Sequence, residues 1–143
     1  LVISIDLSKG MLEKAKKVVN KNDWKNVHIV QEDATKVNTT WLATQFDNKL
    51  RADAILCDLG LSGFPDWEKV IDNLYELLAP QGRLVIMDWY ISKPTLRGKF
   101  IKWIGKGEVN RPLFQYLETK VETFSVNKSF KGGDLFVATG IKK

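Results

Sequence analysis

Branched and apolar residues form four short runs in the first 90 residues of the chain, and each run is followed by polar or turn-forming residues. Such runs predict buried strands, here over 1–5, 27–31, 52–59 and 83–89. Apolar residues recur at helical spacing after Ser8 and after Asp66, two residue types that favour a helix N-cap. A shorter helix is expected over 41–46, capped by Thr39 or Thr40. The pattern therefore alternates strands and helices.

The last third of the chain follows a different pattern. Short helices are expected over 94–104 and 112–117, each with a proline at an early position that a helix tolerates. Two apolar runs, 121–130 and 135–141, flank a Lys-Gly-Gly-Asp turn, which predicts an antiparallel hairpin. The turn at 80–82 is expected to end the helix that precedes it. The whole order predicts an α/β fold with a C-terminal antiparallel hairpin.

Composition limits the kinds of site that the chain can hold. Its 143 residues suit one domain, and 44% hydrophobic with 27% charged residues is the balance of a folded globular chain. A single cysteine, Cys57, excludes an internal disulfide, and a single histidine, His28, excludes a two-histidine metal motif. No metal site is expected, and His28 is expected to pack on its strand. Sparse cysteine favours a cytoplasmic location.

The positive charge is concentrated in one segment. The formal net charge is +5. Six basic residues and one acidic residue lie between Lys93 and Arg111, which leaves 16 of each elsewhere in the chain. Phe100, Ile101, Trp103 and Ile104 lie among these cations. This mixture favours an anionic ligand or a membrane surface, and the alternative is a solvated basic face on an ordinary packed helix.

Acidic residues stand at the ends of the four predicted strands that precede the hairpin: Asp6, Asp33, Asp58 and Asp88. In an open α/β sheet, ligands bind beyond the carboxyl ends of the strands, where one acid can accept the two ribose hydroxyls of a nucleotide. An acid at the next strand end can accept from an adenine amine. The alternative is that these acids cap the helices that follow them.

These residues resemble the class I S-adenosylmethionine-dependent methyltransferases. The resemblance rests on the segments 6–15, 30–34 and 77–88 and on the terminal hairpin. It implies a Rossmann-like, doubly wound and mostly parallel sheet, with S-adenosylmethionine as the cofactor. The residues that it implies for cofactor binding are Asp6, Leu7, Asp33, Ala34, Asp58 and Leu59, with Asp6 at the ribose and Asp33 at the adenine amine. The segment 89–117 is most similar to the quinone-biosynthesis and phospholipid methyltransferases.

The chain also departs from that family. The family's first strand, its glycine-rich loop and the helix after them are expected to be missing, because only five residues precede Asp6 and Gly10 is the only glycine before Gly60. Residues 1–143 are therefore expected to form one partial methyltransferase domain with weak activity on its own. Gln81 stands where the family more often has glycine.

The resemblance implies methyl transfer to a small-molecule or lipid acceptor. Trp89, Tyr90, Arg97 and Lys102 are expected on the acceptor side, and the basic segment is expected to meet an anionic acceptor or to contact a membrane peripherally. No catalytic residue is assigned, although Asp58 and Asp88 are the carboxylates expected within reach. A nucleic-acid substrate is not favoured, because 57–60 replaces the Asn-Pro-Pro-Tyr type of segment.

Two other functions stay open. An acid after a strand serves the ribose of NAD equally well, so an NAD-dependent oxidoreductase fragment is one alternative. The other is a non-catalytic or truncated module whose basic segment binds a partner or a membrane. A hydrolase is excluded, because Phe64 stands where the nucleophile elbow begun by Gly60 requires a glycine.

Overall fold

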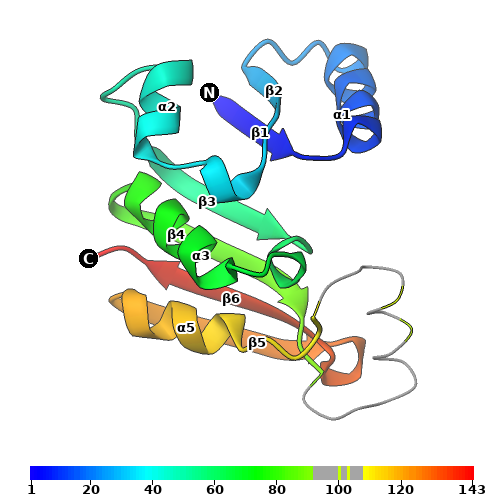
Figure 1. The fold of residues 1–143 in the computed structure, drawn as a ribbon, viewed down its shortest axis with the longest axis vertical. Helices are drawn as coiled ribbons and strands as arrows, with labels where there is room; N and C mark the ends of the chain where they lie inside the picture. Colours follow the sequence, from blue (N-terminus) through cyan, green and yellow to red (C-terminus); the bar gives the residue numbers. More distant parts are fainter. Residues whose placement is uncertain (92–99, 101–102, 104–107) are drawn as a thin grey trace. The chain divides into compact units, whose positions relative to one another are not determined.

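The computed structural model describes residues 1–91, 100, 103 and 108–143 (Figure 1). These residues form two compact units, which we call unit 1 (Leu1–Val37) and unit 2 (Asn38–Lys143). Each unit is described by itself.

Unit 1 is a parallel two-stranded sheet with one crossover helix. Strand β1 (Val2–Asp6) pairs with β2 (Val27–Gln31), and helix α1 (Lys9–Lys21) connects them. The Ser8 hydroxyl caps α1, because its oxygen accepts a hydrogen bond from the Met11 N–H at 3.4 Å. Leu12 is the buried side chain of α1. Both strands and the cap of this unit were predicted correctly from the sequence.

Unit 2 contains a four-stranded sheet in the order β3-β4-β6-β5. Strand β3 (Ala52–Asp58) is parallel to β4 (Leu78–Trp89), while β6 (Leu135–Ile141) is antiparallel to both β4 and β5 (Thr123–Phe130). The predicted terminal hairpin is therefore confirmed, with β6 inserted between β4 and β5.

One face of this sheet forms the core of unit 2. Helices α3 (Trp67–Leu77) and α5 (Leu113–Lys120) both pack on the sheet and are joined by the Tyr116 hydroxyl, which donates to Asp72 at 3.0 Å (Figure 1). Helix α2 (Thr39–Gln45) contacts α3. The fully buried apolar side chains of this core come from α3, α5 and alternate positions of β4 and β6: Val70, Ile71, Leu78, Leu84, Ile86, Leu113, Leu117, Phe136 and Ala138.

Three local predictions were wrong. Asn38, rather than Thr39 or Thr40, caps α2, because its side-chain oxygen accepts from the Trp41 N–H at 2.9 Å. Asp66 stands at the N-cap of α3, but its side chain makes no capping hydrogen bond. Strand β4 begins at Leu78, which pairs with Ala52, so the 80–82 turn lies within the strand instead of before it.

The expected helix over 94–104 lies outside the described residues except for Phe100 and Trp103. Among the residues that are described, no helix is long and apolar enough to span a bilayer. The same residues contain no cluster of histidine, cysteine and acidic side chains that could hold a metal ion.

Candidate functional site

In unit 1, the two parallel strands bring Asp6 and Asp33 to the same edge of the sheet. Asp6 is the last residue of β1 and pairs with Gln31, the last residue of β2. The Glu32 N–H donates to the Asp6 carbonyl oxygen at 3.3 Å, which continues the pairing to the residue before Asp33. Both carboxylates therefore stand at the carboxyl ends of parallel strands, as predicted.

The Asp6 carboxylate is half-buried and partly satisfied by its own loop. Its Oδ1 atom accepts from the Ser8 N–H at 2.7 Å, which fixes the turn into α1. Its Oδ2 atom has no hydrogen-bond partner among the described residues. Leu7 is exposed, and its carbonyl oxygen accepts from the Gln31 side chain at 3.2 Å. Asp6 therefore keeps one oxygen free to accept a ribose hydroxyl.

Asp33 caps a short 3-10 helix, Ala34–Lys36. Its Oδ1 atom accepts from the Thr35 N–H at 2.9 Å and from the Thr35 hydroxyl at 2.8 Å. These hydrogen bonds, the backbone one first, lower the pKa of Asp33 below its usual value. In the part of the chain that is described, Oδ2 and the Ala34 N–H make no hydrogen bond. The helix-cap alternative is therefore true of Asp33, and it leaves one acceptor and one donor available.

In unit 2, the corresponding strand end is formed by Asp58 and Leu59. Asp58 is exposed at the end of β3. Leu59 has a positive φ of 52°, which turns the chain sharply away from the sheet. Its N–H still donates to the Met87 carbonyl oxygen at 2.8 Å, so the turn is attached to β4. A short 3-10 helix, Leu61–Gly63, follows.

Asp88 differs from the other strand-end acids because it is 0% exposed. Its Oδ2 atom accepts from the Ser62 N–H at 2.9 Å and its Oδ1 atom from the Trp89 N–H at 2.8 Å. Burial raises the pKa of Asp88 above its ordinary value, and these hydrogen bonds oppose that rise. The expectation that this carboxylate is within reach of a ligand was wrong.

The predicted acceptor-side residues are placed only in part. Trp89 ends β4 and is half-buried. The Tyr90 ring packs edge-to-face on Phe114, with centroids 5.0 Å apart, and its N–H donates to the Asp134 carbonyl oxygen at 2.8 Å. Arg97 and Lys102 lie outside the described residues.

Two potential nucleophiles or bases lie away from this chemistry. Burial, and then the nearby Asp88 charge, raise the pKa of Cys57 to about 12, so its thiol stays protonated at neutral pH. His28 is exposed on β2, contrary to the expectation that it packs on its strand.

Sequence reasoning missed the part played by Ser62, whose backbone N–H donates a hydrogen bond to Asp88. A serine in a Gly-Leu-Ser-Gly stretch indicates only a turn, so no sequence pattern could have identified this role.

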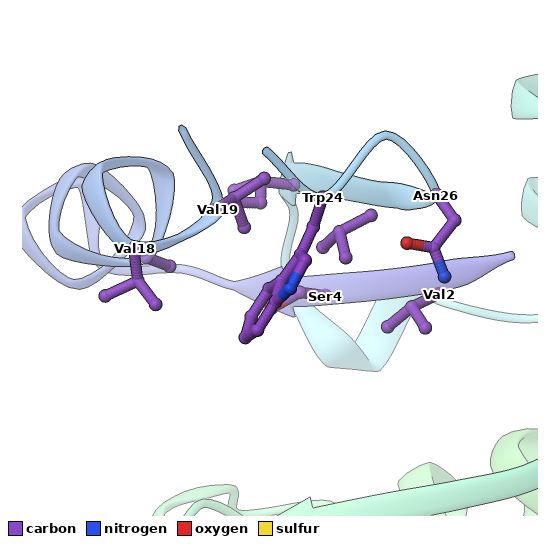
Figure 2. A pocket seen from close by; sticks show the side chains of 9 residues that line it. Val2, Ser4, Val18, Val19, Trp24 and Asn26 are labelled. Carbon is purple, nitrogen blue, oxygen red and sulfur yellow. The ribbon is translucent and has the colours of Figure 1, made fainter. Parts of the chain in front are cut away.

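An open groove of about 580 Å³ lies elsewhere in unit 1 and has an apolar lining. Figure 2 shows the Trp24 side chain between Val18 and Val19 of α1 and Ser4 of β1. None of the predicted cofactor or acceptor residues lines the groove. The candidate cofactor site therefore consists of strand ends rather than of this groove.

The chain that carries these strand ends is similar to known methyltransferases. The family described as "Methyltransferase domain" matches residues 1–123. A curated relative, the demethylmenaquinone methyltransferase of Lactococcus lactis subsp. lactis (strain IL1403), is 33% identical over 95 residues. That match covers 66% of this chain and 34% of the relative, so the chain spans about a third of the relative's length.

Solved structures share the fold at low sequence identity. An O-methyltransferase family protein from Burkholderia thailandensis matches with a TM-score of 0.73 and 14% identity, over 99% of this chain and 43% of that one. The N-methyltransferase NodS from Bradyrhizobium japonicum WM9, in complex with S-adenosyl-l-homocysteine, matches with a TM-score of 0.68 and 15% identity, over 98% and 65%. The Rossmann-like fold is thereby confirmed, and the chain belongs to the methyltransferase-domain family of class I S-adenosylmethionine-dependent methyltransferases.

Proposed function

We propose that this protein transfers a methyl group from S-adenosylmethionine to a small-molecule or lipid acceptor. The observation that carries the proposal is the pair of strand-end carboxylates in unit 1, Asp6 and Asp33, each with one oxygen left without a partner among the described residues. Because the chain belongs to the methyltransferase family, a nucleotide-like cofactor is the ligand that these two carboxylates suit best.

The residues of unit 1 fit the nucleoside part of that cofactor. The free oxygen of Asp6 would accept from the ribose hydroxyls, and the free oxygen of Asp33 would accept from the adenine amine. The Ala34 N–H would donate to a ring nitrogen, and the exposed Leu7 side chain offers an apolar surface to the base. In unit 2, the family resemblance implies Asp58 and Leu59 as further cofactor-binding residues. The bound cofactor would supply a methyl group that its sulfonium makes electrophilic.

The protein's own contribution would be orientation and exclusion of water. A general base is required only where the acceptor must lose a proton. Asp88 is not available for that role, because it is buried and both of its oxygens accept backbone N–H groups. Asp58 is the exposed carboxylate at this edge of unit 2, and no catalytic role is assigned to it.

The acceptor is proposed to be a small molecule or lipid, anionic or borne on a membrane. The relationship to a demethylmenaquinone methyltransferase supports this class. Trp89 and Tyr90 would contact the acceptor, together with Arg97 and Lys102 of the basic segment between Lys93 and Arg111. A cytoplasmic location with peripheral membrane contact belongs to the same proposal.

Calorimetric titration with S-adenosylhomocysteine tests the cofactor assignment. Asp6→Ala should weaken binding by about 1.5–3 kcal/mol, the scale of a charge-assisted hydrogen bond. Glu13→Ala, which removes an exposed acid of α1, is the matched control and should bind like the parent. Asp33→Asn should also weaken binding, because it replaces one acceptor with a donor. Equal affinity in all variants would contradict the assignment.

Two further titrations separate the other candidate functions. Binding of NADH in place of S-adenosylhomocysteine would favour an oxidoreductase. Replacing Lys99, Lys102 and Lys106 together with glutamine should weaken binding to anionic vesicles at low salt and leave cofactor affinity intact. Vesicle binding that is equal in the parent and the triple variant would leave these lysines as an ordinary solvated face.

A further inference from the structure

A buried carboxylate that the proposed chemistry does not use joins the two predicted walls of the site in unit 2. Asp88 lies near the end of β4, between the loop that carries Asp58 and Leu59 and the segment that begins with Trp89. It is fully buried, although Asp is among the residue types most often found on the surface. A buried charge is costly unless hydrogen bonds satisfy it, so its partners indicate what it stabilises.

The first partner is the loop after β3. That loop is attached to β4 at two points: the Leu59 N–H donates to the Met87 carbonyl oxygen at 2.8 Å, and the Ser62 N–H donates to Asp88 Oδ2 at 2.9 Å. The short stretch between these points includes the positive φ of Leu59. The side chain of Asp88 therefore closes the loop whose first residues are predicted to meet the cofactor.

The second partner is the acceptor side. The other oxygen of Asp88 accepts from the Trp89 N–H at 2.8 Å. The Ser62 carbonyl oxygen in turn accepts from the Glu108 N–H at 2.9 Å, and the Ile91 N–H donates to the Val109 carbonyl oxygen at 2.6 Å. Trp89 is thus bonded to this carboxylate directly, and Glu108, which precedes α5, is connected to it through Ser62.

We propose that Asp88 is a positioning residue that holds the cofactor-side loop, 59–63, and residues 89–91 on the acceptor side in one fixed arrangement. That this arrangement serves the binding of cofactor and acceptor rests on the proposed function. The carboxylate is specifically suited to the task, because both N–H groups need an acceptor and a carboxylate has no donor. Asparagine has nearly the same shape but must present an NH₂ group to one of the two N–H donors.

The role is positioning and not catalysis, because neither oxygen is exposed to a ligand. The titratable group that faces Asp88 from the neighbouring strand is Cys57, whose pKa of about 12 leaves it neutral over the range in which a carboxylate titrates. Asp58 at the end of β3 and Asp134, whose carbonyl oxygen accepts from the Tyr90 N–H, are further acids on the neighbouring segments, so the titration is repeated on Asp88→Asn, in which the common midpoint should be absent.

The first measurement uses the ligand-free protein, as the parent and as Asp88→Asn. In an NMR pH titration, the amide protons of Ser62 and Trp89 should shift with one common midpoint, because both are donated to the same carboxylate. The Ser62 amide should also exchange slowly with solvent, and Asp88→Asn should accelerate that exchange at least tenfold. Independent midpoints, or an unchanged exchange rate in the variant, would overturn the proposed positioning.

The second measurement connects positioning to function. Asp88→Asn should weaken S-adenosylhomocysteine binding at least tenfold at a temperature where circular dichroism shows the variant folded. Ile71→Val, a conservative change in the core of α3, is the stability control and should bind within twofold of the parent. Equal losses in the two variants, or none in either, would overturn the functional part. A parent that does not bind S-adenosylhomocysteine would count against the proposed function, and the amide data alone would then decide the role of Asp88.

Discussion

The strand-end acids of unit 1, Asp6 and Asp33, and the last strand-end acid of unit 2, Asp88, have opposite environments. In unit 2, α3 and α5 pack on the sheet and alternate residues of its central strands β4 and β6 are buried, and Asp88 is one of these buried residues. In unit 1, the buried apolar side chains among the described residues are Leu12 and Val37, while Val18 and Trp24 are 50% exposed. The same sequence feature, an acid at the end of a parallel strand, is therefore buried in a core at Asp88 and accessible to solvent at Asp6, Asp33 and Asp58.

The difference teaches what such an acid can do. Asp6 and Asp33 each use one oxygen to order their own loops and keep the other for a ligand. Asp88 uses both oxygens on backbone N–H groups and keeps none. All three residues are aspartates. Whether such an acid can bind a ligand depends on its burial and on how many backbone N–H groups already donate to it.

The comparison predicts a large difference in sensitivity to core truncation. Leu84 in β4 is 0% exposed, so Leu84→Ala should lower the free energy of unfolding by about 2–5 kcal/mol, because a cavity is left behind. Val18→Ala in the half-exposed groove of unit 1 should cost less than about 1 kcal/mol. Hydrogen exchange of the β4 and β2 amides would measure each loss locally. Similar losses at the two positions would show that the groove of unit 1 is buried in solution.

The sequence predicted the elements better than it predicted the environments. Apolar runs located every strand, and Ser8 was identified as a cap, because these depend on neighbours in the chain. The start of β4 at Leu78 was missed because its pairing with Ala52 is non-local and offsets the turn signal of Pro80 and Gly82. The burial of Asp88 was missed for the same reason, since its partner Ser62 lies 26 residues away.

A second prediction concerns close packing at the hairpin. A Cβ atom at Gly140 would lie 2.5–2.9 Å from side-chain atoms of Val121, so alanine there must displace a neighbour. We expect Gly140→Ala to lower the unfolding free energy by about 1–3 kcal/mol. Labelling of the half-buried Cys57 thiol during denaturant unfolding would follow unit 2 directly. Gly140→Ala combined with Val121→Ala should recover part of the loss, and a single variant as stable as the parent would show that β6 adjusts freely.

A third prediction concerns pH, where the two kinds of acid should act with opposite signs. The pKa of Asp88 is raised, so its contribution to folding is fully present below the unfolded value of about 3.9 and is lost as pH rises through the folded pKa. The pKa of Asp33 is lowered, so its contribution is present above about 3.9 and is lost as pH falls through the folded pKa.

Denaturant titrations between pH 3 and pH 7, roughly the range over which carboxylates titrate, would measure both slopes. Relative to the parent, Asp88→Asn should become less destabilised or more stable as pH rises, and Asp33→Asn should become less stable. Cys57 labelling reports on unit 2, and exchange of the β2 amides reports on unit 1. Slopes of the same sign in both variants would contradict the contrast between Asp88 as a buried anchor and Asp33 as a half-buried helix cap.

The smallest expected effect is in α1, where unit 1 can be strengthened without touching its acids. Gly10 lies in the first turn of the helix, and a Cβ atom there would meet nothing within 4 Å. Gly10→Ala should stabilise α1 by about 0.5 kcal/mol, because alanine loses less backbone freedom on folding than glycine. Exchange of the α1 amides should slow about twofold, since 1.4 kcal/mol corresponds to a tenfold change. Gly63→Ala, whose Cβ atom also meets nothing within 4 Å, is the control in unit 2 and should leave α1 exchange unchanged. Faster α1 exchange in Gly10→Ala would show that the first turn of α1 is not helical in solution, and the hydrogen bond from Ser8 to Asp6 would then no longer define the geometry of the proposed ribose acid.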